Sequence, residues 1–301
     1  MKTFSITAPD GLEMAAALIA PEEPRAILVL VHGMAEHKER YYPFMTYLAE
    51  KGFACLITDL RGHGATAASP EQLGHFGEKG RQQLVEDSLS VIRYAKGIYP
   101  GLKLFLMGHS MGSLIVRCVS KYHDSELDGL VVCGSPSRNG AAGAGLLLAR
   151  LIGLFKGGRY RSAFLEKLTT GAYNKKFAQE GRNAWLSTNK ANVQAYNNDP
   201  LCGFPFTVRG YQGLLGLMEE TYDVDDWKVS RPTLPIHFIA GADDPCIGDI
   251  GKFSQAVSFI RGRGYATVTS KVYPGLRHEI LNELGKENVW TDVEALLTSW
   301  L

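Results

Sequence analysis

The chain has 301 residues, of which 45% are hydrophobic and 21% charged, and its net charge is +1. This composition is typical of a globular protein, and because Lys and Arg are spread along the chain it argues against nucleic acid as a partner. The five cysteines are odd in number, lie far apart and have no C-x-x-C spacing. We therefore predict free thiols in a reducing cytoplasm.

The first ten residues contain no apolar stretch of the signal-peptide kind, which also favours a cytoplasmic location. No apolar run reaches the roughly 20 residues needed to span a bilayer. The longest run, 141–155, is shorter and contains Arg150. We expect a soluble protein that contacts membrane at most transiently.

Short apolar runs alternate with helical patterns over most of the chain, which is typical of a parallel sheet covered by helices. The predicted strands cover 3–8, 13–19, 26–31, 53–58, 103–107, 130–133, 235–240 and 266–273. The first two flank Pro9-Asp10-Gly11, a turn signal, and are predicted to form a hairpin. The predicted helices between and after the strands cover 40–51, 82–99, 111–123, 250–261 and 289–301.

The alternation stops between 135 and 231, where only helix-like pieces separated by Gly, Asn and Pro occur, at 146–155, 163–169, 192–197 and 210–221. We predict an α/β core of residues 1–134 and 232–301, interrupted by a helical insertion of residues 135–231. Segment 146–155 is apolar nearly all round, which favours a buried helix. Alternatively, side chains such as Leu147 and Leu151 line an acyl pocket or face a membrane.

Ser110 lies at the centre of Gly108-His109-Ser110-Met111-Gly112, which fits the G-x-S-x-G pattern. A predicted strand precedes it and a predicted helix follows, the setting that places a nucleophilic serine at the apex of a sharp turn. The helix N-terminus favours negative charge, and the Met111 N–H can point at a developing oxyanion. The flanking elements make this pattern much more specific than the five residues alone.

A serine nucleophile needs a base and a carboxylate that orients the base, and in this kind of fold they follow in the order serine, acid, histidine. Of the histidines after Ser110, one precedes the insertion and one lies inside a predicted strand, so His278 is the candidate base. Two acids, Asp243 and Asp244, follow the strand at 235–240. Pro245 restricts the backbone of Asp244, but residue context leaves both open.

The loop after the strand at 26–31 is the expected source of a second oxyanion donor. Gly33 permits close approach of the backbone, and the Met34 N–H is the predicted donor. His32, Glu36 and His37 have the spacing H-x-x-x-E-H, which differs from the zinc-helix patterns, so we predict that these three residues do not form a metal site together. Instead, Glu36 and His37 are expected to hydrogen-bond around the loop.

Asp59-Leu60-Arg61-Gly62-His63-Gly64 follows the strand at 53–58. Its glycines indicate a tight loop, and we expect Asp59 and Arg61 to pair across it. Cys246, two residues after Asp244, is expected to be either a reactive thiol or a buried, inert one.

Several motifs in order resemble the monoacylglycerol lipase and lysophospholipase group of α/β-hydrolases, particularly its bacterial members. The matching segments cover 32–37, 59–64, 108–112, 198–204 and 273–280. The resemblance implies an α/β-hydrolase fold, a mostly parallel central sheet flanked by helices, with a helical cap inserted between strands six and seven. It further implies that Ser110, Asp244 and His278 form a triad, that Met34 and Met111 supply the oxyanion N–H groups, and that no cofactor is required.

The function predicted in this way is hydrolysis of carboxylic esters, with monoacylglycerols, lysophospholipids or similar lipid esters as the expected substrates. An amide or thioester hydrolase on the same triad is the alternative, but an aminopeptidase needs acidic residues that hold a free amino terminus, and sequence does not place them. Ser110 argues against dehalogenases of this fold, which use Asp. A non-catalytic binding protein is disfavoured because all three triad residues are present.

Overall fold

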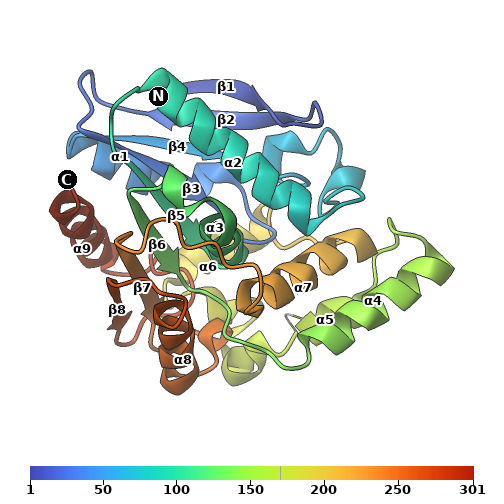
Figure 1. Cartoon of the computed structure of the whole chain (residues 1–301). Coiled ribbons are helices and arrows are strands. Elements are labelled where there is room, and N and C mark those ends of the chain that lie inside the picture. Colours follow the sequence, from blue (N-terminus) through green and yellow to red (C-terminus); the bar gives the residue numbers. More distant parts are fainter. Residues whose placement is uncertain (170) are drawn as a thin grey trace.

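The computed structural model describes residues 1–169 and 171–301, and within them eight strands form one sheet in the order β1-β2-β4-β3-β5-β6-β7-β8 (Figure 1). Strands β3 to β8 run parallel, whereas β2 is antiparallel to β4 and β1 is antiparallel to β2. Their bounds are β1 Lys2–Thr7, β2 Glu13–Ile19, β3 Ala26–Val31, β4 Phe53–Thr58, β5 Leu104–His109, β6 Gly129–Cys133, β7 Ile236–Gly241 and β8 Val268–Tyr273. The predicted mostly parallel sheet and its opening hairpin are confirmed.

Helices cover both faces of the sheet, as continuous apolar strands require. Successive side chains of β3 point to opposite faces, so Val29 belongs to one core and Leu30 to the other. The Leu30 face is covered by α1 Tyr42–Glu50 and α9 Lys286–Ser299. The Val29 face is covered by α2 Arg81–Ile98, α3 Met111–His123 and α8 Ile250–Arg261.

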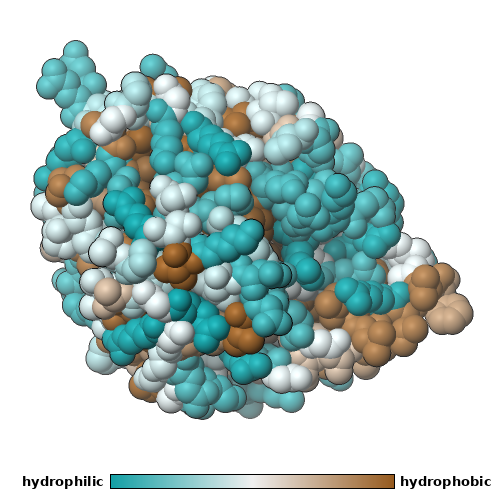
Figure 2. Space-filling view, viewed as in Figure 1, coloured by the Kyte–Doolittle hydropathy of each residue, from teal (hydrophilic) through white to brown (hydrophobic). Residues whose placement is uncertain are grey.

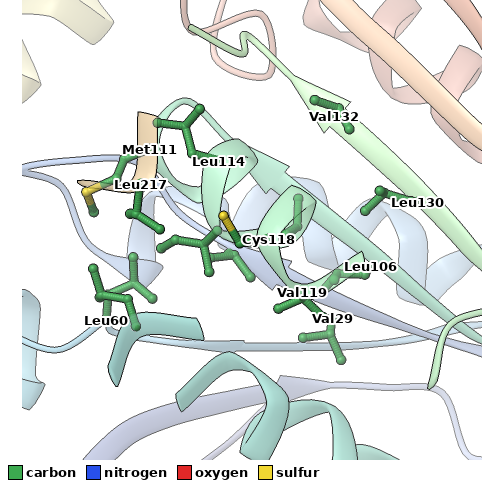
Figure 3. Close-up of a cluster of buried hydrophobic side chains, with 14 of the residues drawn as sticks. Val29, Leu60, Leu106, Met111, Leu114, Cys118, Val119, Leu130, Val132 and Leu217 are labelled. Carbon is green, nitrogen blue, oxygen red and sulfur yellow. The ribbon is translucent and has the colours of Figure 1, made fainter. Parts of the chain in front are cut away.

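Helix α3 is anchored in the core directly behind the turn that carries Ser110. Figure 3 shows Leu114, Cys118 and Val119 of α3 among Val29 and Leu106 of the central strands. These side chains are fully buried, and burying an aliphatic side chain of this size contributes roughly 1.5–3 kcal/mol. The core therefore holds the beginning of α3 firmly at the carboxyl edge of the sheet.

The predicted helical insertion lies between β6 and β7, and three of its helices, α4, α5 and α7, lie together on one side of the molecule (Figure 1). They are α4 Ala142–Lys156, α5 Ala163–Thr169, α6 Lys190–Asn198 and α7 Val208–Tyr222. Helix α7 packs against α2, α3 and α4, so it joins the insertion to the core. Short 3-10 turns occupy Lys38–Tyr41, Gly64–Thr66, Pro70–Gln72, Asp124–Glu126, Tyr173–Glu180, Ala184–Leu186 and Pro245–Ile247.

The prediction that segment 146–155 is a buried helix is wrong. The fully buried residues of α4 are small, Ala142, Gly145 and Ala149, with Leu146 and Ile152 partly buried against the core, and the helix packs on α7. Its other large apolar side chains are mostly exposed, Leu154 by 80% and Phe155 by 84%. Figure 2 shows apolar side chains gathered at the end of the molecule where Figure 1 places α4 and α5.

The predicted pairing of Asp59 with Arg61 is also wrong, because the two side chains point to different neighbours. Asp59 accepts from the Lys38 ammonium at 2.7 Å, whereas Arg61 pairs with Asp87 at 2.9 Å and with Asp10 at 2.9 Å. Both arrangements still tie the loop after β4 to the core. Among the described residues, no helix is long and apolar enough to cross a membrane.

Candidate active site

Ser110 occupies the turn between β5, which ends at His109, and α3, which begins at Met111. Its backbone has φ +54° and ψ −118°, a conformation that non-glycine residues rarely adopt and that persists where the surroundings enforce it. A Cβ on Gly108 would lie 2.3 Å from the Gly112 carbonyl oxygen, and one on Gly112 would lie 2.2 Å from that of Val31. Both glycines of the G-x-S-x-G pattern are therefore required by close backbone approach.

His278 and Asp244 come from the loops after β8 and β7, and their side chains meet. His278 Nδ1 lies 2.9 Å from Asp244 Oδ2, and both side chains are buried. The other Asp244 oxygen accepts from the Cys246 N–H at 2.8 Å, which fixes the carboxylate. Asp243 points away into solvent, where it pairs with Lys176 at 3.0 Å. The geometry thus separates two acids that residue context left open.

The loops that carry Asp244 and His278 are packed backbone to backbone. A Cβ on Gly241, the last residue of β7, would lie 2.2 Å from the carbonyl oxygens of both Leu276 and Arg277. The Asp243 N–H also donates to the Leu276 carbonyl at 3.0 Å. These contacts set the distance between the two loops.

The loop after β3 lies directly against Ser110, since a Cβ on Gly33 would be 3.2 Å from the Ser110 Cβ. The buried Glu36 carboxylate shapes this loop by accepting from the Gly33 N–H at 2.6 Å and from the Tyr41 hydroxyl at 2.9 Å. Within the described residues, the backbone N–H of Met34 has no hydrogen-bond partner. The Met111 N–H, in the first turn of α3, is equally unpaired in that part of the chain. Met34, Met111 and Ser110 all line one cavity, so two free donors belong to residues that border the serine.

Glu36 is ionised despite its burial. Burial opposes the charge, but the hydrogen bond to His109 and the Arg40 guanidinium outweigh it and hold the pKa of Glu36 well below its usual range. Burial also opposes the charge on His109 and by itself lowers the pKa of that imidazole. The hydrogen bond and charge of Glu36 outweigh burial, so the pKa of His109 is raised above its usual value. His109 Nε2 lies 3.1 Å from the His278 carbonyl oxygen, so this charged pair connects the loop after β3 to the loop of His278.

Arg40 extends the same network, because it pairs with Glu36 at 2.9 Å and with Glu279 at 2.6 Å. Sequence reasoning expected hydrogen bonds from Glu36 but missed His109, Arg40 and Glu279. The only signal in the sequence was the adjacency of Glu279 to His278 and of His109 to Ser110.

Ser110 and Met34 line two cavities of different chemistry. The first has a volume of about 360 Å³ and mixed walls, in which Glu36, Asn174, Arg182, Asn183 and Glu279 stand beside apolar side chains such as Trp185 and Phe204, and His278 also borders it. The second has a volume of about 90 Å³ and is walled largely by apolar side chains, among them Leu168, Leu214, Leu215 and Met218. The site can therefore accept a molecule with a polar part on one side of Ser110 and an apolar part on the other.

Leu147 and Leu151, the candidate substrate-binding residues of α4, line neither cavity. They are exposed by 58% and 45%. The apolar lining comes instead from α5 and α7, whose inward residues the sequence pattern did not distinguish from ordinary core positions.

Cys246 is buried in contact with the Tyr173 hydroxyl at 3.8 Å. Burial and the neighbouring Asp244 charge raise the pKa of its thiol, which favours the inert of the two expected roles. Asp244, Cys246 and His278 also offer ligand atoms within 4.8 Å of one another. A cation held there would occupy the side chains that pair His278 with Asp244.

The chain is similar to known hydrolases over most of its length. A family model described as serine aminopeptidase, S33, matches residues 22–285. The chain is similar to a monoacylglycerol lipase of Mycolicibacterium smegmatis, with 28% identity over 93% of this chain and 89% of that protein. It is 26% identical to the mouse monoglyceride lipase, over 92% of this chain and 82% of that protein. A thermostable carboxyl esterase from Bacillus coagulans, solved with glycerol, superposes with a TM-score of 0.90 and 28% identity over 99% and 98% of the two chains.

Proposed function

The chain belongs to the serine aminopeptidase, S33, family of α/β-hydrolases, and we propose that it is a serine hydrolase that cleaves carboxylic esters of lipids. One observation carries this proposal above the others. Ser110, held in a strained turn, shares a cavity with His278, and His278 lies 2.9 Å from the buried Asp244. A nucleophile, a base and an orienting carboxylate are the parts that acyl transfer needs.

In the proposed mechanism Ser110 Oγ attacks the acyl carbonyl carbon while His278 Nε2 accepts the hydroxyl proton. Asp244 holds the proton on His278 Nδ1 and stabilises the imidazolium that forms. The carbonyl oxygen becomes an oxyanion, which accepts hydrogen bonds from the N–H groups of Met34 and Met111. Collapse of the intermediate breaks the ester bond, and His278 returns its proton to the leaving alcohol. Water then attacks the acyl-enzyme by the same route and releases the acid.

The two cavities support a lipid ester as substrate. We assign the acyl chain to the apolar cavity at Leu214 and Leu215 and the alcohol to the larger cavity, beside its polar residues Asn174 and Asn183. Each methylene buried in an apolar cavity contributes roughly 0.8 kcal/mol, so chain length is expected to affect binding strongly. A monoacylglycerol, with a small polar alcohol and one chain, matches this division, and relatives in bacteria and mouse carry that name.

The helical insertion is part of this proposal. We assign residues 135–231 to a cap over the core formed by 1–134 and 232–301, because Leu168 and Leu215 of the insertion and Ser110 of the core line one cavity. The cap thus supplies the acyl-binding wall, whereas the core supplies the reacting groups.

The test is a turnover panel of monoacylglycerols, lysophospholipids, short p-nitrophenyl esters, a thioester and an aminoacyl p-nitroanilide. We expect turnover of the monoacylglycerols and loss of it in Ser110→Ala. Ser254→Ala is the matched control, because Ser254 is exposed on α8. Turnover of the anilide without turnover of any ester would replace the ester proposal with an aminopeptidase. Turnover retained in Ser110→Ala would remove the proposed nucleophile.

We also propose that the cap contacts lipid surfaces through α4. Leu154 and Phe155 are the most exposed large apolar side chains of that helix, and the exposed Lys156 and Arg159 follow them. An apolar edge inserts between lipid head groups, and neighbouring basic side chains attract anionic ones. Sedimentation with vesicles of phosphatidylcholine, with and without phosphatidylserine, tests this contact. We expect Leu154→Ser combined with Phe155→Ser to abolish binding and Ile250→Ser, on α8, to leave it unchanged; equal binding of all three proteins would contradict the contact.

A further inference from the structure

A second group of chemically reactive side chains lies outside the proposed triad, where the insertion meets the loop after β3. His37 belongs to that loop, and Asp199 and Cys202 belong to the connection between α6 and α7. His37 Nε2 lies 2.8 Å from Asp199 Oδ2. The ligand atoms of all three residues lie within 4.8 Å of one another.

The other nitrogen of the same imidazole has a carboxylate partner. His37 Nδ1 lies 2.5 Å from Glu39 Oε2. In metal sites, a ligating histidine usually engages a carboxylate or carbonyl with its second ring nitrogen, which fixes the ring and its tautomer. Glu39 would play this part if His37 Nε2 bound a cation.

We propose that His37, Asp199 and Cys202 form a binding site for a thiophilic divalent cation of the Zn²⁺ class. An imidazole, a carboxylate and a thiolate are ligands that such a cation accepts, with bonds of about 2.0–2.3 Å in a tetrahedron. Ligand atoms in that tetrahedron are about 3.3–3.8 Å apart. His37 Nε2 and Asp199 Oδ2, which are 2.8 Å apart, need to separate slightly, and side-chain rotations can supply this.

Cation binding at this site exchanges protons for the metal ion. The cation replaces the proton on His37 Nε2 and the proton on Cys202 Sγ, so two protons are released. The bound site then carries a 2+ cation against one carboxylate and one thiolate. The positive charge of the nearby Arg40 is matched by its partners Glu36 and Glu279.

The site is accessible from solvent. His37 and Cys202 are buried, but the side chains of Asp199 and Glu39 are exposed by 32% and 45%. The cation therefore has an entry path at the Asp199 side, and the fourth ligand position is left to water.

Such a cation would tie the insertion to the loop that carries the proposed oxyanion donor. The Gly203 N–H and the Tyr196 hydroxyl already donate to the Ala35 carbonyl, at 2.9 and 3.0 Å. A metal at His37 and Cys202 would add a third tie beside these hydrogen bonds. The inference does not depend on the proposed function, since the ligands differ from the triad residues.

The test is a titration of the metal-free protein with Cd²⁺, followed by the thiolate-to-metal absorption band in the ultraviolet. We expect one equivalent to bind with this band, and Cys202→Ser to abolish the band. Cys246→Ser is the matched control, because Cys246 is a second buried thiol beside a histidine and an aspartate. A band absent from the wild-type protein, or one lost in Cys246→Ser and kept in Cys202→Ser, would overturn the site.

Two further measurements test the proposed cation site if the Cys202→Ser protein is unstable. Glu39→Gln is expected to keep the band at saturation but to weaken Cd²⁺ affinity about 10- to 100-fold. Zn²⁺ is expected to raise the unfolding temperature of the wild-type protein and not that of Asp199→Asn, because a ligand that binds only the folded state stabilises it. Unchanged affinity in Glu39→Gln together with an equal Zn²⁺ response in Asp199→Asn would contradict the assignment.

Discussion

Replacing Glu36 by glutamine tests whether a buried charge shapes the proposed oxyanion loop. Glutamine is nearly isosteric and can still accept from the Gly33 N–H and the Tyr41 hydroxyl, but it loses the ionic contacts to Arg40 at 2.9 Å and to His109 at 3.3 Å. Hydrogen bonds to charged groups contribute about 1.5–3 kcal/mol each, and the neutral amide recovers part of this through easier burial. Arg40 also keeps a second carboxylate partner. We therefore expect the free energy of unfolding to fall by about 2–4 kcal/mol.

The effect on catalysis follows from the position of the loop. Complete loss of one oxyanion donor costs about 10²–10³ in kcat, so a displaced Met34 N–H should lower kcat by roughly 10- to 100-fold with little change in KM. Thermal unfolding and steady-state kinetics on a monoacylglycerol measure both effects. Glu50→Gln, an exposed glutamate on α1, is the matched control. A Glu36→Gln protein with the kcat of the control, even if less stable, would refute the positioning role.

Three further predictions follow from the same structure. Gly241→Ala should abolish ester hydrolysis and lower the unfolding temperature, because its Cβ would be 2.2 Å from two carbonyl oxygens of the loop that carries His278. Thermal unfolding followed by circular dichroism and an ester turnover assay check this, and a fully active, stable variant would contradict the loop packing. Burial lowers the pKa of His63 to about 3. Because the unfolded chain binds the same proton near pH 6.5, the free energy of unfolding should be at its full value above pH 6.5 and fall as the pH drops toward 3. Urea unfolding at several pH values should find a shallower fall in His63→Phe, and an unchanged slope would argue against this assignment. Leu215→Phe should narrow the apolar cavity beside Ser110 and reduce kcat/KM for long acyl chains at least tenfold while sparing acetyl esters, whereas equal losses for both would move the acyl chain elsewhere.

The strands and the turn at Ser110 were predicted well from the sequence, because each depends on residues that are close together in the chain. Apolar runs located the central strands β3, β4, β5 and β6 to within two residues, because these strands are buried on both faces and consist mainly of apolar residues. The outer strands β1 and β8 are largely exposed and were also located to within two residues. The turn at Ser110 was identifiable because its glycines and the flanking elements are contiguous. The similarity to monoacylglycerol lipases, inferred from ordered motifs, is confirmed by the family match and the relatives.

The features that sequence could not predict depend on where side chains point. Asp243 and Asp244 are neighbours with the same chemistry, and only the backbone of the turn directs one to His278 and the other to solvent. The exposure of Phe155 could not be predicted from composition, because the fully buried residues of α4 are small and several of its large apolar ones are exposed.

Long-range networks were equally invisible to sequence analysis. Arg40 and Glu279 are 239 positions apart, and His37 and Asp199 are 162 apart. No local pattern relates residues at such separations. Glu279 reaches Arg40 from the loop after β8, and Asp199 reaches His37 from the insertion, so both pairings form only in the folded chain.

The most direct test of the proposed function is covalent labelling of the intact protein with a fluorophosphonate, followed by mass spectrometry of its peptides. Such probes react with a serine that an adjacent base activates. The mechanism predicts one adduct per chain, located on Ser110, absent from Ser110→Ala and strongly reduced in His278→Ala. An unlabelled wild-type protein, or an adduct on another residue, would contradict the assignment of Ser110 as the nucleophile.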